Sequence, residues 1–290
     1  MKAQLPVWLA IATILTYAAG YPLGSASVAV MPFGLVLLLR FSASAVVLWG
    51  LVAALRIPLP SRQQLLHCSV AGLMIQGVQF TALYWALQEG VSAGLASLLI
   101  ALNPVTTSVL LLVMGQSKED RRGVVSLVLA LAAVVCACAP RIAQDHSIGL
   151  PLIGVGVALA GLTVGGIYQG RLVRGTNPLV ITAVAITASI PIAALATILM
   201  PGPVEDWTRG LAIVGAMVII SSVAATTLYS ACIHRAGARA ASILFAIIPA
   251  TASLMAWVTL GEAISGFTII GIILGAAACL ISLRPARTPQ

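Results

Sequence analysis

Long, nearly uninterrupted runs of apolar residues are the feature that most constrains this chain. A helix that spans a bilayer needs about 20 apolar residues, and runs of that length fill almost all of the 290 residues. Only 8% of the residues are charged, whereas soluble domains carry about 25%. A chain with so few charges cannot cover a water-facing surface. The sequence therefore predicts a protein whose surroundings are lipid.

The breaks between the apolar runs predict an all-α polytopic membrane protein with ten transmembrane helices. The expected spans cover residues 6–25, 32–55, 65–88, 93–115, 122–140, 150–170, 178–200, 210–233, 238–260 and 265–283. The first run follows Lys2 as a signal peptide would, but it is long enough to span and no clear cleavage site separates it from the next run. We therefore expect this first helix to be retained.

The distribution of positive charge predicts the orientation of the ten spans. If the N-terminus is cytoplasmic, twelve of the 15 Lys and Arg residues lie in cytoplasmic segments, only Arg141 and Arg209 lie outside, and Arg40 lies within a span. This asymmetry follows the positive-inside rule and places both termini in the cytoplasm of a bacterial inner membrane. The net charge of +8 is scattered along the chain, so no basic patch indicates a nucleic-acid partner.

The chain contains an internal repeat at an offset of 145 residues. Thr81–Ser108 aligns without gaps to Thr226–Ser253, and more than a third of the paired positions are identical, among them Tyr84 with Tyr229 and Pro104 with Pro249. The offset predicts two five-helix repeats, residues 1–145 and 146–290. Because five is odd, the second repeat must cross the bilayer in the opposite direction to the first. Inverted repeats of this kind are typical of secondary transporters with a site near the bilayer midplane.

A motif in the second half is similar to that of a known family. Small residues, a proline and a Gly-Glu pair follow one another at Ala240–Ala241–Ser242, Pro249 and Leu260–Gly261–Glu262, with Gly271 beyond them. With the ten spans, this pattern resembles EamA-type exporters of the drug/metabolite transporter superfamily, and most closely the YddG-like amino-acid exporters. The first half departs from the pattern after Pro104, where Gly115–Gln116–Ser117–Lys118 replaces the Gly-Glu pair.

The resemblance implies a secondary transporter that exports small metabolites, with neutral or aromatic amino acids as the first expectation. A facilitative channel and an exporter of other small amphiphiles or drugs remain alternatives. The expected partners are a small-molecule substrate and the lipid bilayer, and we expect a monomer or a weak homo-oligomer. No paired carboxylates, His/Asp cluster or metal-ligand set appears in or beside the spans, so we expect neither an enzyme, a cofactor nor a metal.

Arg40 is the only charged residue deep within a predicted span. A guanidinium in the bilayer core is costly unless it meets water or a polar partner. It could therefore bind an anionic group such as an amino-acid carboxylate. Alternatively, it could have a structural role, bonded to polar neighbours.

Further candidate residues for substrate binding lie on several spans. Those on the third span share one helical face, which either lines a cavity or contacts another helix. The candidates are Gln76, Gln79, Phe80 and Tyr84 on the third span, Tyr17 and Tyr21 on the first, Asn103 on the fourth and Tyr168 on the sixth. The two tyrosines of the first span could equally be interfacial anchors.

Two prolines and a group of hydroxyls complete the predictions. Pro104 and Pro249 should interrupt the fourth and ninth spans and act as hinges or cavity-wall positions. The hydroxyls of the eighth span should bond back to carbonyls of their own helix, as is usual in apolar helices; they are Ser221, Ser222, Thr226 and Thr227. No Asp, Glu or Lys lies deep in a span, which favours transport without a proton relay.

Overall fold

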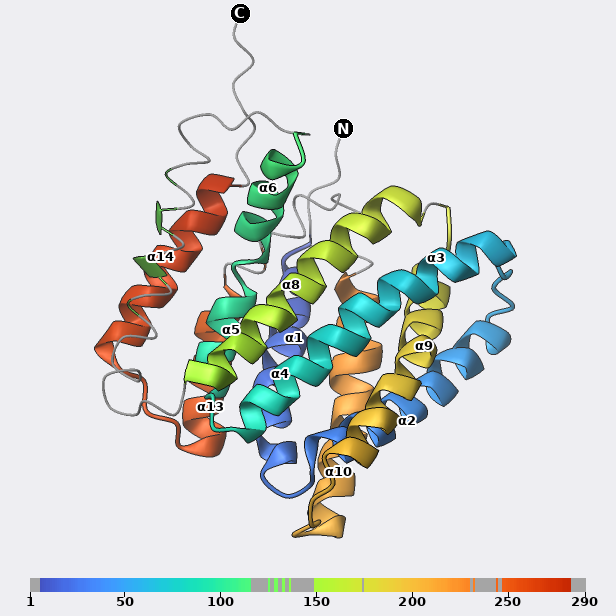
Figure 1. Cartoon of the computed structure of the whole chain (residues 1–290), viewed down its shortest axis with the longest axis horizontal. Helices are drawn as coiled ribbons and strands as arrows, with labels where there is room; N and C mark the ends of the chain where they lie inside the picture. The colour runs from blue at the N-terminus through green and yellow to red at the C-terminus, as the bar shows by residue number, and fades with distance from the viewer. Residues whose placement is uncertain are drawn as a thin grey trace, which may run out of the picture.

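The computed structural model describes residues 6–115, 149–173, 175–229 and 247–282, with the single positions 125, 128, 129, 132, 133, 136, 232 and 244. All regular elements in this part of the chain are helices (Figure 1). The first half contains α1 (Val7–Val28), α2 (Phe33–Ala54), α3 (Arg62–Gly72), η1 (Leu73–Val78), α4 (Gln79–Gln88), α5 (Ala93–Ile100) and α6 (Asn103–Val113). The second contains α8 (Gly149–Leu172), α9 (Pro178–Leu199), α10 (Trp207–Met217), η3 (Val218–Ala225), α13 (Ile248–Leu260) and α14 (Gly266–Ser282).

Seven helical stretches among the described residues are long and apolar enough to cross a membrane, and two shorter apolar helices, α13 and α14, follow them. These stretches coincide with predicted spans one to four and six to eight. Most of the predicted fifth span and residues 238–243, 245 and 246 of the ninth lie outside the described residues. A polytopic membrane protein is therefore confirmed, and the count of ten helices stays a prediction.

Polar residues define where several of these helices begin. Ser61, Ser92, Asn177 and Asp206 each accept a hydrogen bond from a backbone N–H in the first turn of the helix that follows. Such caps satisfy N–H groups that have no partner within the helix. The capping residues therefore fix the ends of α3, α5, α9 and α10 at the two faces of the bundle.

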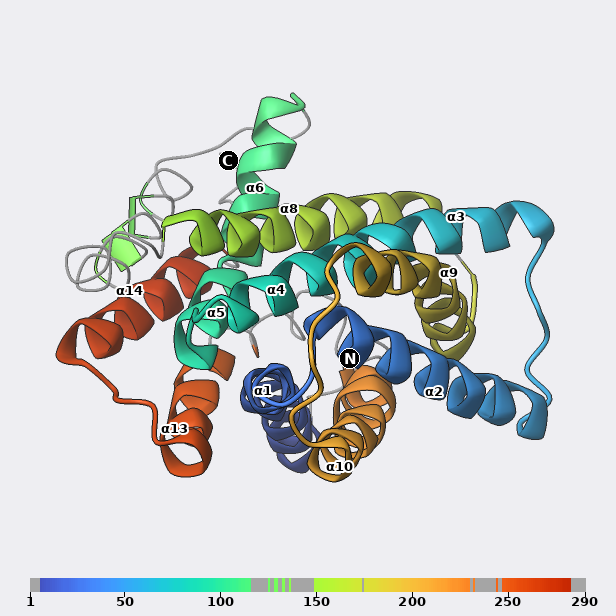
Figure 2. The ribbon, with the colours of Figure 1, turned by 60° about the horizontal axis from the view of Figure 1, so that its bottom comes forward.

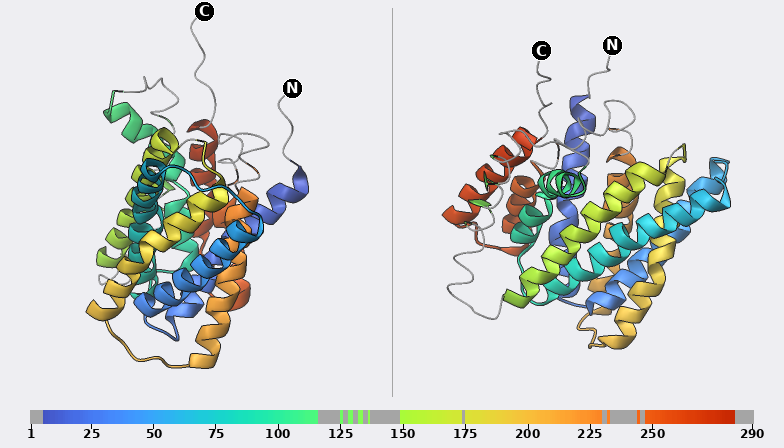
Figure 3. Two further views of the ribbon diagram at one scale, coloured as in Figure 1. Left: turned by 90° about the vertical axis from the view of Figure 1, so that its right-hand side faces the viewer. Right: turned by 45° about the horizontal axis from the view of Figure 1, so that its top comes forward.

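The helices run between two opposite faces that differ in charge (Figures 1 and 3). The α2–α3 and α8–α9 connections lie toward the upper right of Figure 1, with Arg56, Arg62 and Arg171 at or near them; we call this the basic face. The opposite face carries the connections before α2, α5, α10 and α14, and we call it the acidic face. All four acidic residues that the structure describes lie there: Glu89, Glu205, Asp206 and Glu262. The start of α1 and the end of α14 lie on the same side of the bundle.

The two halves repeat each other at the offset seen in the sequence. Helix α2 and helix α9 both have 22 residues, and α9 starts 145 positions after α2. The same offset separates the starts of α3 and α10, of η1 and η3, and of α6 and α13. Helices α2 and α9 pack against each other and run in opposite directions (Figure 2), as expected for inverted repeats.

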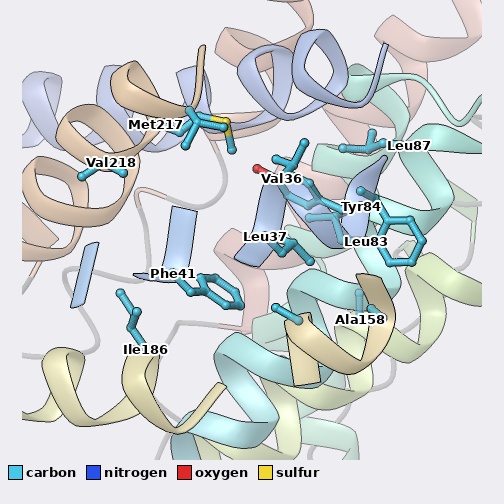
Figure 4. Close-up of a cluster of buried hydrophobic side chains, with 14 of the residues drawn as sticks. Val36, Leu37, Phe41, Leu83, Tyr84, Leu87, Ala158, Ile186, Met217 and Val218 are labelled. Atoms are coloured by element: carbon cyan, nitrogen blue, oxygen red, sulfur yellow. The ribbon is translucent and has the colours of Figure 1, made fainter. Parts of the chain in front are cut away.

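The core is shared between the halves. Figure 4 shows Phe41 of α2, Tyr84 of α4, Ile186 of α9 and Met217 of α10 within one cluster. Because lipid is as apolar as these side chains, close packing rather than exclusion from water holds such helices together. The shared core therefore positions polar side chains of one half against those of the other.

Candidate functional site

Arg40 lies between the two halves of the bundle. Its side chain is on α2, is only 4% exposed, and donates a hydrogen bond from Nη1 to the Tyr84 hydroxyl of α4 at 2.9 Å. Its Nε donates to Ser222 Oγ of η3, in the second half, at 3.2 Å. Both partners are uncharged, and all four described carboxylates lie at the acidic face. The structure therefore places a buried cation in the bundle without a described counter-ion.

Aromatic rings surround this guanidinium. Its Cζ lies 4.6 Å from the centre of the Phe80 ring and 5.8 Å from that of Tyr84, within the range of cation–π attraction. The Phe80 and Tyr84 rings are 6.0 Å apart, and the Tyr84 hydroxyl lies against Gly24 of α1. We call Arg40, Phe80, Tyr84 and Ser222 the central cluster. The structure thus brings together three residues that the sequence proposed as candidates and adds Ser222.

Two further candidates, Tyr17 and Tyr21, lie on α1 where it packs against α13. Tyr21 also packs against the large core cluster that contains Tyr84. The Tyr17 ring meets that of Tyr229 edge-on, with 5.5 Å between the ring centres. Tyr229 is the 145-residue counterpart of Tyr84, so both halves contribute an aromatic ring at equivalent positions. An apolar or aromatic group would find rings from three helices in this region.

Several buried polar atoms have no hydrogen-bond partner among the described residues. They include Oε1 of Gln79, which is 7% exposed, and Oγ of Ser44, one turn beyond Arg40 on α2. Oγ of Ser221, next to Ser222, is a third. Buried polar groups in folded proteins are almost always paired, so such atoms call for a water or a ligand as partner. Gln76, in η1, is half-buried and precedes Gln79 by three residues.

Each half presents its part of this region from a π-helical segment. Segment η1 ends at Val78, immediately before Gln79 and Phe80, and η3 contains Ser221 and Ser222. π-Helical turns inside α-helices are rare and occur frequently at functional sites. Sequence reasoning missed both segments, since hydropathy does not distinguish a π turn from an α turn. The structure shows that η1 and η3 occupy equivalent positions in the two halves.

The role expected for Ser222 was wrong. Thr226 does bond back to a carbonyl of its own helix, that of Ser222, as predicted for the hydroxyls of this span. Ser222 Oγ instead accepts the hydrogen bond from Arg40. This hydrogen bond has a charged donor and is therefore stronger than one between neutral groups.

Asn103 and Tyr168 have partners away from the central cluster. Asn103 Oδ1 accepts a hydrogen bond from Thr163 Oγ1 of α8 at 2.9 Å. The Tyr168 hydroxyl lies 2.9 Å from His67 Nδ1 of α3. Both pairs join the first half to the second, so they hold helices against each other. A direct part in substrate binding stays a prediction for these two residues.

The two prolines mark helix starts rather than positions within a continuous helix. The fourth span is interrupted between Ile100 and Asn103, and Pro104 is the second residue of α6. Pro249 occupies the same place in α13. Proline lacks a backbone donor and is well tolerated in the first turn of a helix. The interruption before Pro104 fits the prediction of a local break. Most residues before Ile247 lie outside the described part of the chain, so a break at Pro249, and hinge motion at both prolines, stay predictions.

The comparisons with known proteins bear on the whole chain. The sequence profile described as the EamA-like transporter family matches it twice, over residues 4–138 and 148–284. A solved structure described only as the crystal structure of a protein superposes with a TM-score of 0.67 and 18% sequence identity, over 95% of each chain. At that identity the superposition shows the shared fold. No curated protein matches the sequence.

Proposed function

Because the chain belongs to the EamA-like transporter family, we propose that it carries neutral and aromatic amino acids across the membrane by alternating access. The family and the apolar helices make it a multi-pass membrane transporter of small substrates. The amino-acid specificity is an inference from the central cluster and from the resemblance to YddG-like exporters.

The observation that carries this proposal is the environment of Arg40. A guanidinium has five N–H donors, and two of them are used by Tyr84 and Ser222. Among the described residues the other donors have no hydrogen-bond partner. An amino-acid carboxylate would supply both the missing acceptors and the missing negative charge, and arginine binds carboxylates through two parallel hydrogen bonds. The buried cation is therefore suited to hold one carboxylate.

The surroundings of Arg40 restrict the rest of the substrate. Phe80, Tyr84 and Tyr21 offer aromatic surface, which favours an apolar or aromatic side chain. A sugar phosphate carries more negative charge and would call for several basic residues, whereas Arg40 is the only Lys or Arg in the interior of the described spans, the others lying at span ends. A neutral amino acid, which brings one carboxylate and no net charge, fits this arrangement best.

Counterflow in proteoliposomes tests the proposal directly. Vesicles loaded with unlabelled phenylalanine, leucine, alanine or phosphoenolpyruvate receive trace radiolabelled phenylalanine outside. We expect saturable accumulation of label with the amino acids and none with the phosphate ester. Linear, non-saturating entry of label would instead indicate a channel, since only a carrier exchanges one substrate for another. Absence of exchange with all three amino acids would contradict the proposal.

A pH gradient added to the same vesicles tests coupling. The described spans contain no Asp, Glu or Lys in their interiors, and proton relays within membranes usually depend on such groups or on histidine. We therefore expect the gradient to leave net amino-acid flux unchanged. Concentrative uptake driven by the gradient would contradict this expectation.

The proposed orientation has the basic face in the cytoplasm. Four described arginines lie outside the interiors of the spans: Arg56, Arg62 and Arg171 at the basic face and Arg209 at the acidic face. Cytoplasmic loops generally carry the excess of Lys and Arg. A cysteine at exposed Leu59, in the α2–α3 connection, should resist a membrane-impermeant maleimide added to intact cells. A cysteine at exposed Pro203, in the α9–α10 connection, should react. The reverse pattern would invert the orientation.

A further inference from the structure

We propose that the Glu262 carboxylate is a latch that closes the acidic face of the transporter by binding the first turn of α5 in the opposite half. Glu262 follows the end of α13, and its Oε1 accepts a hydrogen bond from the Ala93 N–H at 3.0 Å. Its Oε2 lies 3.4 Å from the Gly94 nitrogen and accepts from that N–H. One side chain thus joins the connection before α14 to the connection before α5.

The donor end of this contact, the first turn of α5, is chemically suited to a carboxylate. Ala93 and Gly94 are the first two residues of α5, so their N–H groups have no partner within the helix. The N-terminal end of a helix also carries a partial positive charge, which attracts an anion. Ser92 already caps the next free N–H, that of Leu95. Glu262 therefore completes the capping of α5 from outside its own repeat.

The backbone around Glu262 directs the side chain to this position. Gly261 ends α13 in the left-handed conformation, with φ of 69°, which glycine adopts without strain. The Glu262 N–H then bonds back to the Ala256 carbonyl. Helix α13 packs directly against α5: the two are so close at Gly94 that a Cβ there would come within 2.8 Å of Ser253 Oγ. The latch thus sits over a tight contact between the fourth helices of the two repeats.

The aligned positions of the other repeat do not carry the residues of this contact. The counterpart of Glu262 at the 145-residue offset is Ser117, and those of Ala93 and Gly94 are Ala238 and Arg239. A hydroxyl cannot supply the charge that Glu262 brings, so the sequence does not repeat the carboxylate at the aligned position. A latch in one repeat alone would favour closure of the acidic face over closure of the other. This gating role rests on the alternating-access mechanism proposed above.

Distance measurement by pulsed electron paramagnetic resonance tests the latch without any substrate. Spin labels at Glu89→Cys and Ala263→Cys, both exposed, report the separation of the two connections in a variant whose five native cysteines are alanine. We expect Glu262→Ala to raise the population of longer distances about tenfold or more, because it removes charge-assisted hydrogen bonds that hold the two connections together. Glu262→Gln, which keeps an acceptor oxygen but no charge, should give a smaller rise.

A second variant removes the donor instead of the acceptor. Ala93→Pro deletes the N–H, and proline is favoured at the first position of a helix. Ser92 has φ −69° and ψ 151°, which suits a residue before proline. We expect a smaller shift than in Glu262→Ala, because the Gly94 N–H remains as a donor, and no further shift when Ala93→Pro is added to Glu262→Ala. Glu205→Gln, an exposed carboxylate of the same face, is the matched control and should change nothing.

An unchanged distance distribution in Glu262→Ala would overturn the latch. If that variant does not give folded protein, an unchanged distribution in both Glu262→Gln and Ala93→Pro would overturn it equally. Counterflow measured on the same preparations separates the two proposals. Shifted distances without amino-acid exchange would refute the substrate, and exchange without shifted distances would refute the latch.

Discussion

Replacing Arg40 by alanine is expected to lower counterflow of neutral amino acids at least about 30-fold at subsaturating concentration. Removing one partner of a buried, hydrogen-bonded charge pair costs about 2–5 kcal/mol, and each 1.4 kcal/mol is a factor of ten. The guanidinium is 4% exposed and has no described counter-ion, so a bound carboxylate would form such a pair. Initial rates in proteoliposomes at matched protein content measure the effect.

Three further measurements distinguish a substrate-binding Arg40 from a purely structural one. The Arg40→Ala variant should lose the rise in melting temperature that saturating phenylalanine gives the unmodified protein, because only a bound ligand stabilises the folded state in this way. Arg40→Lys keeps the charge but loses the planar fork, so intermediate exchange is expected. Arg62→Ala, at the exposed start of α3, should exchange normally. Normal exchange by folded Arg40→Ala would contradict the assignment.

The arrangement of the helices was largely predictable because the bilayer imposes it. Within the bilayer every backbone N–H and C=O of a span must be hydrogen-bonded within its own helix. The length of an apolar run therefore locates helices such as α2 and α9 closely. Their directions follow from the charges at the ends and from the 145-residue repeat. The sequence did not indicate that the third span of each half changes to a π-helical turn, because apolar residues such as those of Leu73–Val78 are compatible with both kinds of turn.

The candidate site was predictable only in part. A charge within an apolar run is conspicuous, and one helical face connects Phe80 to Tyr84, so these residues were found with Arg40. Ser222 was assigned to its own helix because most hydroxyls of apolar helices bond there. Its true partner is 182 positions away in the chain, and a contact of that kind depends on how the two halves meet. The bond between Glu262 and the start of α5 escaped prediction for the same reason.

Gly72→Val is expected to destabilise the protein by about 3 kcal/mol or more, the upper part of the range for overpacking. A Cβ at Gly72 would overlap Ala185 Cα and lie 2.9 Å from the Ala185 carbonyl oxygen. These are backbone atoms of α9, so no side-chain rotation relieves the clash, and α3 must move away. The displacement would also stretch the hydrogen bond from Ser189 Oγ to the Gly72 carbonyl, now 3.1 Å.

The melting temperature in detergent measures this effect. For a chain of this size about 3 kcal/mol corresponds to a fall of roughly 6–12 °C. Gly50→Val is the control, because Gly50 is an exposed helical glycine of α2 with no atom within 4 Å of its ideal Cβ, and it should melt near the unmodified protein. Equal melting temperatures for the two variants would show that α3 and α9 do not approach as closely as described.

Since Gly72 immediately precedes η1, separation of α3 from α9 would also displace Phe80 and Tyr84 from Arg40. A stable Gly72→Val variant would therefore weaken the case for the central cluster as well.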